Sequence, residues 1–151
     1  MKKLLAGFSL VEVLVFISVL GLFFTAAMSV TTFNLQSMKV QEHKILATRL
    51  AEEGIEWVKD EKETDWSTFI THDTSGTGTI YCLNSLEDDW GTLGDCGVSY
   101  SLGSPPFFLR NLLIENTGSP VDQVDTTITV SWKEGSDSKN VQIKSVFKLL
   151  E

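Results

Sequence analysis

The chain is poor in the residues that build catalytic or metal centres. It has two histidines and two cysteines among 151 residues, and neither His43 nor His72 stands at a ligand spacing from Cys82 or Cys96. The Gly-x-Ser-x-Gly and His-Glu-x-x-His motifs are both absent, and no candidate nucleophile is associated with either histidine. We therefore expect no catalytic residue, no metal site and no cofactor, which indicates a protein that is not an enzyme.

Proline is absent before residue 105, so nothing earlier in the chain forces a helix to break. From Phe8 to Val30 the residues are almost all apolar, and Glu12 is the only charge. As a helix this run is ~35 Å long, enough to cross a hydrocarbon core of ~30 Å. We predict one helix of ~80 Å from about Phe8 to about Lys62. Residues 8–30 would form a transmembrane segment, and residues 31–62 an amphipathic half that packs on a head.

The amphipathic half has one face for packing and one of like charge. The expected packing face recurs at three-, four- and seven-residue intervals and comprises Leu35, Met38, Ile45, Leu46, Leu50, Gly54, Trp57 and Val58. On the other face, Glu52, Glu56 and Asp60 make two unfavourable i, i+4 pairs. Solvent or neighbours must therefore stabilise that face.

Basic side chains are scarce as well, since 12 Lys and Arg stand against 20 Asp and Glu for a net charge of −8. This acidity disfavours non-specific nucleic-acid binding, which needs cations to neutralise phosphates. Two of the lysines, Lys2 and Lys3, precede the apolar run, so the positive-inside rule places the N-terminus in the cytoplasm and everything after Val30 outside. Disulfides are permitted there. A Cys82–Cys96 bridge would close a loop of about 15 residues and stabilise by ~3 kcal/mol; two free thiols are the alternative.

Glu12 is the anomaly of the apolar run. A charge at the centre of a lipid-exposed helix costs roughly 2.5–3.5 kcal/mol, although an acid about one turn from the helix start can snorkel. Acids within membranes usually have a partner. The natural partner is an α-amino group on a neighbouring copy of the helix, which exists near Glu12 only if the chain is cut just before Phe8. The alternative is an acid tolerated near a helix end.

These residues resemble a known family. The two lysines, a spacer and Gly7-Phe8-Ser9-Leu10-Val11-Glu12-Val13-Leu14 are similar to the N-terminal signature of type IV pilins and pseudopilins. The resemblance implies that a prepilin peptidase cuts between Gly7 and Phe8, that Phe8 is N-methylated and that Glu12 forms the assembly salt bridge with a neighbour's amine. An ordinary secretory signal would have a shorter apolar region, uninterrupted by an acid. Residues 1–7 would then be a leader peptide.

The remainder of the chain is predicted to form an extracytoplasmic β-rich head, residues 63–151. Residues 64–78 are polar and rich in Gly, Ser and Thr, which predicts a loop, and 75–78 lack the Lys-Ser/Thr of a phosphate-binding loop. The expected strands are Thr79–Leu83, Val98–Leu102, Phe107–Ile114, Thr126–Trp132 and Val141–Leu149. The last two form the strongest hairpin signal, across a turn at 134–139. The fold class is thus α+β, a long N-terminal helix packed on a C-terminal antiparallel sheet.

Several local features of the sequence allow two interpretations. The acidic stretch from Glu87 to Asp95 either binds calcium through clustered oxygens or is a solvated loop held by the disulfide. Trp66 and Trp90 are either exposed contacts or packed against the head. Arg110, within Phe107-Phe108-Leu109-Arg110, belongs to a C-terminal pattern that also resembles minor pilins.

The resemblance implies a structural role. We expect a pilin or minor pilin of a type IV pilus-like filament, made as a single-pass precursor in the inner membrane and then transferred to an extracellular or periplasmic filament. Its partners would be other pilin subunits, the prepilin peptidase and an inner-membrane assembly platform, with no nucleic acid. The alternatives are a minor pseudopilin of a type II secretion system and a membrane-anchored binding domain that never polymerises.

Overall fold

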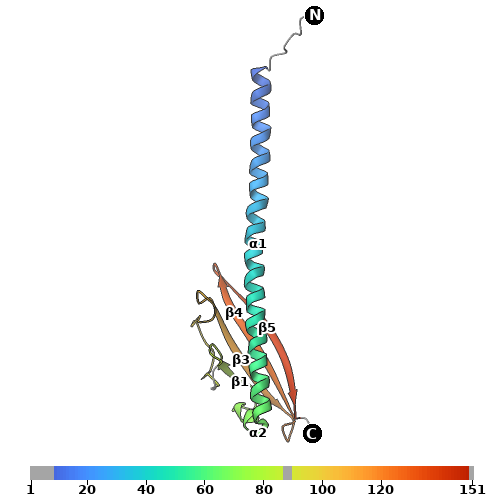
Figure 1. Cartoon of the computed structure of the whole chain (residues 1–151), viewed down its shortest axis with the longest axis vertical. Coiled ribbons are helices and arrows are strands. Elements are labelled where there is room, and N and C mark those ends of the chain that lie inside the picture. The colour runs from blue at the N-terminus through green and yellow to red at the C-terminus, as the bar shows by residue number, and fades with distance from the viewer. Residues whose placement is uncertain (1–8, 87–89, 150–151) are drawn as a thin grey trace, which may run out of the picture. The chain divides into compact units, whose positions relative to one another are not determined.

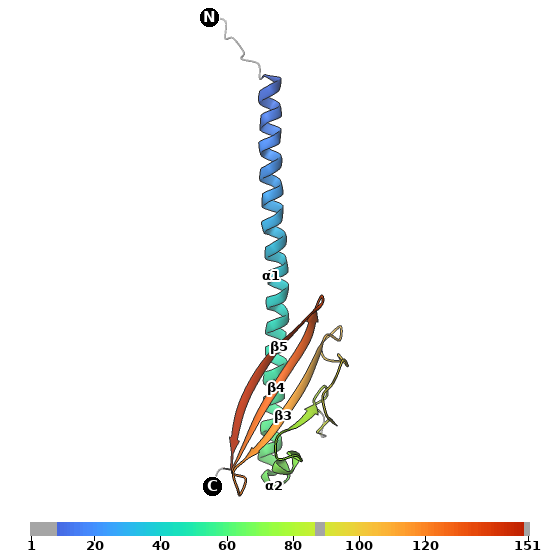
Figure 2. The ribbon, with the colours of Figure 1, turned by 180° about the vertical axis from the view of Figure 1, so that it is seen from behind.

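The computed structural model describes residues 9–86 and 90–149. The chain comprises two compact units, Met1–Gln41 and Glu42–Glu151, and the helix α1 (Leu10–Thr64) contributes to both. The second unit, called here the C-terminal unit, contains a five-stranded antiparallel sheet on which the later turns of α1 pack (Figures 1 and 2). The predicted α+β fold, a long N-terminal helix on an antiparallel sheet, is therefore confirmed.

The sheet is built mainly from three long strands. Its order is β2-β1-β3-β4-β5, with bounds Thr79–Cys82 for β1, Thr92–Leu93 for β2, Phe108–Thr117 for β3, Gln123–Glu134 for β4 and Asp137–Lys148 for β5. The predicted hairpin is confirmed as β4 and β5, but its turn is tighter than expected. Glu134 pairs with Asp137, so only two residues form the turn, and the first of them, Gly135, has φ +64°. A two-residue hairpin turn needs such a positive φ, which glycine adopts without strain.

Alternation along the hairpin directs one face of the sheet towards the helix. In β4 the even-numbered residues from Val124 to Trp132 are buried, with Val124, Ile128 and Val130 fully so. In β5 the half-buried partners are Val141 opposite Val130 and Ile143 opposite Ile128. Since side chains in a strand alternate between faces, this confirms the predicted packing of the β-branched face on the helix.

The helix meets the sheet through small residues, of which the sequence pattern singled out Gly54 and Val58 but not the two alanines. The buried positions of α1 are Ala47, Ala51, Gly54 and Val58. Of the predicted packing face, Ile45 and Leu46 are exposed instead, as are Leu35 and Met38 in the first unit. The prediction was wrong there because hydrophobicity ranks a leucine above an alanine, whereas close approach of a helix to a sheet favours the smallest side chains.

Two other local predictions also need correction. The expected loop at 64–78 contains a short helix α2 (Trp66–Phe69) and a 3₁₀ turn, Ile70–His72. Asp65 starts α2 as its N-cap, because its carboxylate accepts hydrogen bonds from the backbone N–H groups of Ser67 and Thr68. The expected strand Val98–Leu102 is not formed. Only Leu102 makes a β-bridge, to Phe108, and the residues before it turn locally, with the N–H of Ser99 donating to the carbonyl of Cys96.

Candidate functional site

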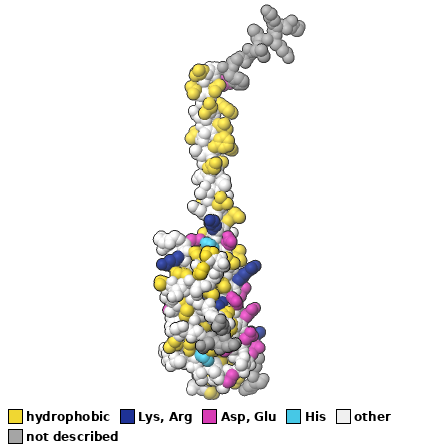
Figure 3. Space-filling model, turned by 60° about the vertical axis from the view of Figure 1, so that its left-hand side comes forward, with side chains coloured by type: hydrophobic (Ala, Val, Ile, Leu, Met, Phe, Trp, Pro, Cys, Tyr) yellow, Lys and Arg dark blue, Asp and Glu magenta, His cyan; other side chains and the backbone are white. Residues whose placement is uncertain are grey.

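The first candidate site is the start of α1, within the unit Met1–Gln41. Every residue of α1 from Leu10 to Leu35 has an exposed side chain, and hydrophobic groups cover this stretch of the helix (Figure 3). The helix α1 is long enough and apolar enough to cross a membrane. An apolar surface of this extent needs lipid or apolar protein around it, because water is an unfavourable neighbour.

Four hydroxyl groups of this stretch bond to the helix itself. Ser18 donates to the carbonyl of Leu14 over 2.9 Å, and Thr25 donates to that of Leu22 over 2.9 Å. Thr31 and Thr32 make equivalent bonds one turn back. These internal bonds lower the cost of placing the four hydroxyls in an apolar medium, whereas the charge of Glu12 remains to be explained.

Glu12 lies in the first turn of α1. Its backbone N–H donates to the carbonyl of Ser9 over 3.0 Å, and a carboxylate here is favoured by the positive end of the helix dipole by roughly 0.3–1 kcal/mol. That is less than the roughly 2.5–3.5 kcal/mol cost of a charge at the membrane centre. Among residues 9–86 and 90–149 no ion pair involves Glu12. The predicted cleavage and methylation residues, Gly7 and Phe8, lie outside the described residues.

In the C-terminal unit, the disulfide between Cys82 and Cys96 is formed. It ties the end of β1 to the segment that follows β2. Asn111 reinforces the tie, since its side chain accepts from the N–H of Cys96 over 2.9 Å and donates to the carboxylate of Asp95 over 2.9 Å. Asp95 is thereby engaged in structure. The other acids of the proposed calcium stretch, Glu87 to Asp89, lie outside the described residues, and the part of the chain that is described contains no cluster suited to a metal ion.

The environment of Arg110 could not be predicted from the sequence. Its side chain is 1% exposed and connects three elements. Nε donates to the carbonyl of Leu83 over 2.8 Å, and Nη1 donates to the carbonyl of Leu50 over 2.7 Å. Nη1 also lies 3.3 Å from the carboxylate of Glu53. Burial lowers the pKa of Arg110, and Glu53 opposes that effect. Through these bonds of Nε and Nη1, the buried Arg110 fixes the helix on the sheet, which is a structural role.

The two tryptophans left open by the sequence pack against the C-terminal unit. Trp90 is buried and Trp66 half-buried. The indole N–H of Trp90 donates to Glu61 over 3.0 Å, and its ring stacks on His72 with 3.6 Å between centroids. His72 is thus part of an aromatic cluster and lies apart from the other histidine.

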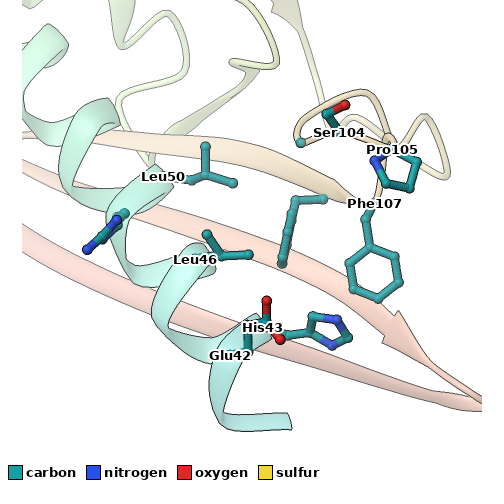
Figure 4. Close-up of a pocket in the computed structure, with 10 residues that line it drawn as sticks. Glu42, His43, Leu46, Leu50, Ser104, Pro105 and Phe107 are labelled. Atoms are coloured by element: carbon teal, nitrogen blue, oxygen red, sulfur yellow. The ribbon is translucent and has the colours of Figure 1, made fainter. Parts of the chain in front are cut away.

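His43 lines a groove of about 470 Å³ between α1 and the loop before β3 (Figure 4). Its ring lies 4.6 Å from that of Phe107, and its Nδ1 lies 3.3 Å from Glu134. Leu46, Leu50 and Pro105 give the groove an apolar lining. Within the described residues, the hydrogen-bond partner of the His43 side chain is Glu134.

Comparison with protein-family models, with curated proteins and with solved structures gives no match for this chain.

Proposed function

We propose that this protein is a structural subunit, a pilin or minor pilin, of a type IV pilus-like filament. Prepilin peptidase cuts the precursor between Gly7 and Phe8, the new terminal amine of Phe8 is methylated, and an inner-membrane platform assembles the subunit. The head stays outside the cytoplasm and reaches an extracellular or periplasmic filament. The chain acts through contacts with other subunits and performs no catalysis.

The observation that supports this proposal most is the isolation of Glu12. Four hydroxyl groups of the apolar stretch bond to their own helix, while the carboxylate of Glu12 has no ion pair within the described residues. In a filament, the exposed apolar side chains of neighbouring helices replace lipid. Glu12 of one subunit then meets the amine of Phe8 of another, which neutralises a buried charge and sets the register of the two helices.

A minor pseudopilin of a type II secretion system is the second candidate, because the same N-terminal residues resemble both classes. An anchored binding domain that does not polymerise is the third. This third candidate does not explain the Gly7-Phe8 junction or the position of Glu12.

The decisive first measurement is mass spectrometry of the N-terminus of the native protein. We expect loss of residues 1–7 together with a methyl group on Phe8. An intact Met1 in the native envelope would overturn the processing step.

The second measurement compares assembly of Glu12→Gln with that of Ser18→Ala. Both change a polar side chain of the same helical stretch, but only the first removes a charge, since Ser18 is neutral and donates to the carbonyl of Leu14. We expect Glu12→Gln to insert and be cleaved normally yet to be depleted from sheared filaments, whereas Ser18→Ala assembles as wild type. Equal incorporation of both variants would refute the pairing of Glu12 with an amine.

A further inference from the structure

The outer face of the C-terminal hairpin, on the side of the sheet away from α1, carries exposed lysines. Residues of β5 alternate between faces, so Lys144 and Lys148 are exposed while Ile143 and Phe147 are half-buried on the helix side. Neither lysine forms an ion pair within the described residues. In that part of the chain, Lys139 is the only lysine of β5 that does so, and its partner is Asp137. β5 is also the last strand of the sheet, so this face lies beside an open edge.

The acid nearest to these lysines in register already has partners. Asp125 of β4 lies on the same outer face, opposite Val146, and its carboxylate accepts hydrogen bonds from Thr117 over 3.2 Å and from Gln123 over 3.1 Å. Asp125 therefore does not neutralise Lys144 or Lys148 by direct pairing.

The helix side of the same unit carries the opposite charge. Glu52, Glu56 and Asp60 are exposed and follow one another at i, i+4 and i+8, where like charges repel. Two nearby cations are paired with other acids, Lys59 with Glu63 at 3.8 Å and Arg110 with Glu53 at 3.3 Å. Arg49, which is exposed one turn before Glu52, forms no ion pair with these three acids within the described residues. Figure 3 shows acidic side chains gathered along one side of the C-terminal unit.

The two surfaces match in length and in charge. The eight helical rises from Glu52 to Asp60 span ~12 Å, and the four strand rises from Lys144 to Lys148 span ~13 Å. In one molecule they cannot meet, because the sheet lies between the helix and the lysines. A contact between different surfaces of two copies is heterologous and repeats from copy to copy without closing on itself unless the rotation closes a ring.

We propose that Lys144 and Lys148 of one copy dock against Glu52, Glu56 and Asp60 of the next copy, so that the occupant of the outer hairpin face is the helix of a second molecule of this chain. This contact adds a second interface to the proposed filament and rests on that proposed function. It is a contact between heads, whereas Glu12 concerns the contact between apolar helices. The helix acids, which destabilise the isolated molecule, are neutralised in this contact.

The first test is charge reversal with rescue, in full-length protein expressed in its native envelope. Lys144→Glu with Lys148→Glu should lower incorporation into filaments about tenfold, because attraction becomes repulsion across the contact. Adding Glu52→Lys and Glu56→Lys should restore most of the loss. Lys139→Glu is the matched control, since Lys139 belongs to the same strand but pairs with Asp137, and it should assemble as wild type. Unchanged tryptophan fluorescence and an intact disulfide exclude misfolding as the cause.

The second test does not require a filament. Copies carrying Lys144→Cys and copies carrying Glu56→Cys are expressed together in the native membrane and treated with a short bis-maleimide. We expect a cross-linked pair only when both variants are present, and none when Lys139→Cys replaces Lys144→Cys. Absence of the cross-link, or failure of the helix reversals to rescue the lysine reversals, would overturn the contact. An unprocessed N-terminus with a positive cross-link would refute the filament proposal but not the contact.

Discussion

Replacing Gly54 by alanine sets two effects of opposite sign against each other. In an isolated helix the change is favourable by about 1 kcal/mol, because glycine is the poorer helix former. In this structure the added Cβ would lie 3.0 Å from Cδ of Arg110 and 3.3 Å from Cδ1 of Ile128. Both distances are shorter than ordinary van der Waals contact, so the neighbours must move.

Neither neighbour can move freely. Arg110 is held by hydrogen bonds to the carbonyls of Leu83 and Leu50, and Ile128 is fully buried. Overpacking of this kind typically costs 1–3 kcal/mol, about 2 at the centre of the range. The contact term therefore exceeds the propensity term, and we expect Gly54→Ala to destabilise the C-terminal unit by about 1 kcal/mol.

The assay is thermal unfolding of the full chain in detergent, followed by tryptophan fluorescence. All four tryptophans, Trp57, Trp66, Trp90 and Trp132, belong to the C-terminal unit, so the signal reports on it alone. A loss of about 1 kcal/mol lowers Tm by roughly 4–5 °C in a unit of this size. Gly21→Ala is the matched control: it makes the same change in the same helix, but its Cβ would meet nothing within 4 Å, and Tm should not fall.

A double substitution tests the mechanism. Ile128→Val removes the Cδ1 atom that the new Cβ would meet, so the cost of Gly54→Ala should be smaller in that background than in wild type. The reasoning is refuted if Gly54→Ala raises Tm, as helix propensity alone requires, or if the two substitutions are additive.

The remaining predictions concern the disulfide and the pH dependence of stability. Replacing Cys82 and Cys96 together by alanine should lower the free energy of unfolding by about 3 kcal/mol, because the disulfide closes a loop across a separation of 14 residues and so restricts the unfolded chain. A chemical denaturation curve measures this loss, and reduced wild type should lose a similar amount. Hydrogen bonds from the side chains of Thr68 and Ser67 lower the pKa of Asp65 from 3.8 to about 2. The N-cap contribution is therefore full above pH 4 and is lost as pH falls towards 2. Wild type should lose more stability over this interval than Asp65→Asn, and parallel curves would show that the N-cap does not titrate as described.

Much of the fold was predictable because it follows from patterns within short stretches of sequence. The absence of proline and the continuous apolar run predict a helix, and α1 extends from Leu10 to Thr64. Alternation in the last two strands predicts which side chains face the helix, and the hairpin register agrees. The charge of Glu12 within the apolar run was equally visible, since it depends on composition and position alone.

What the sequence alone could not supply depends on residues distant in the chain. Ala47 and Ala51 are buried beside Gly54 because the sheet approaches the helix closely there, and no local pattern distinguishes such an alanine from an exposed one. Arg110 is buried because the carbonyls of Leu83 and Leu50 converge on it from two other elements. Val98–Leu102 does not form a strand, because its backbone hydrogen bonds are either local or made to Phe108, and they do not continue as a ladder along a neighbouring strand. Local preference thus determined the type of most elements, whereas the tertiary structure decided which side chains carry their contacts, since burial of a polar or small group is favourable only when its partners are in place.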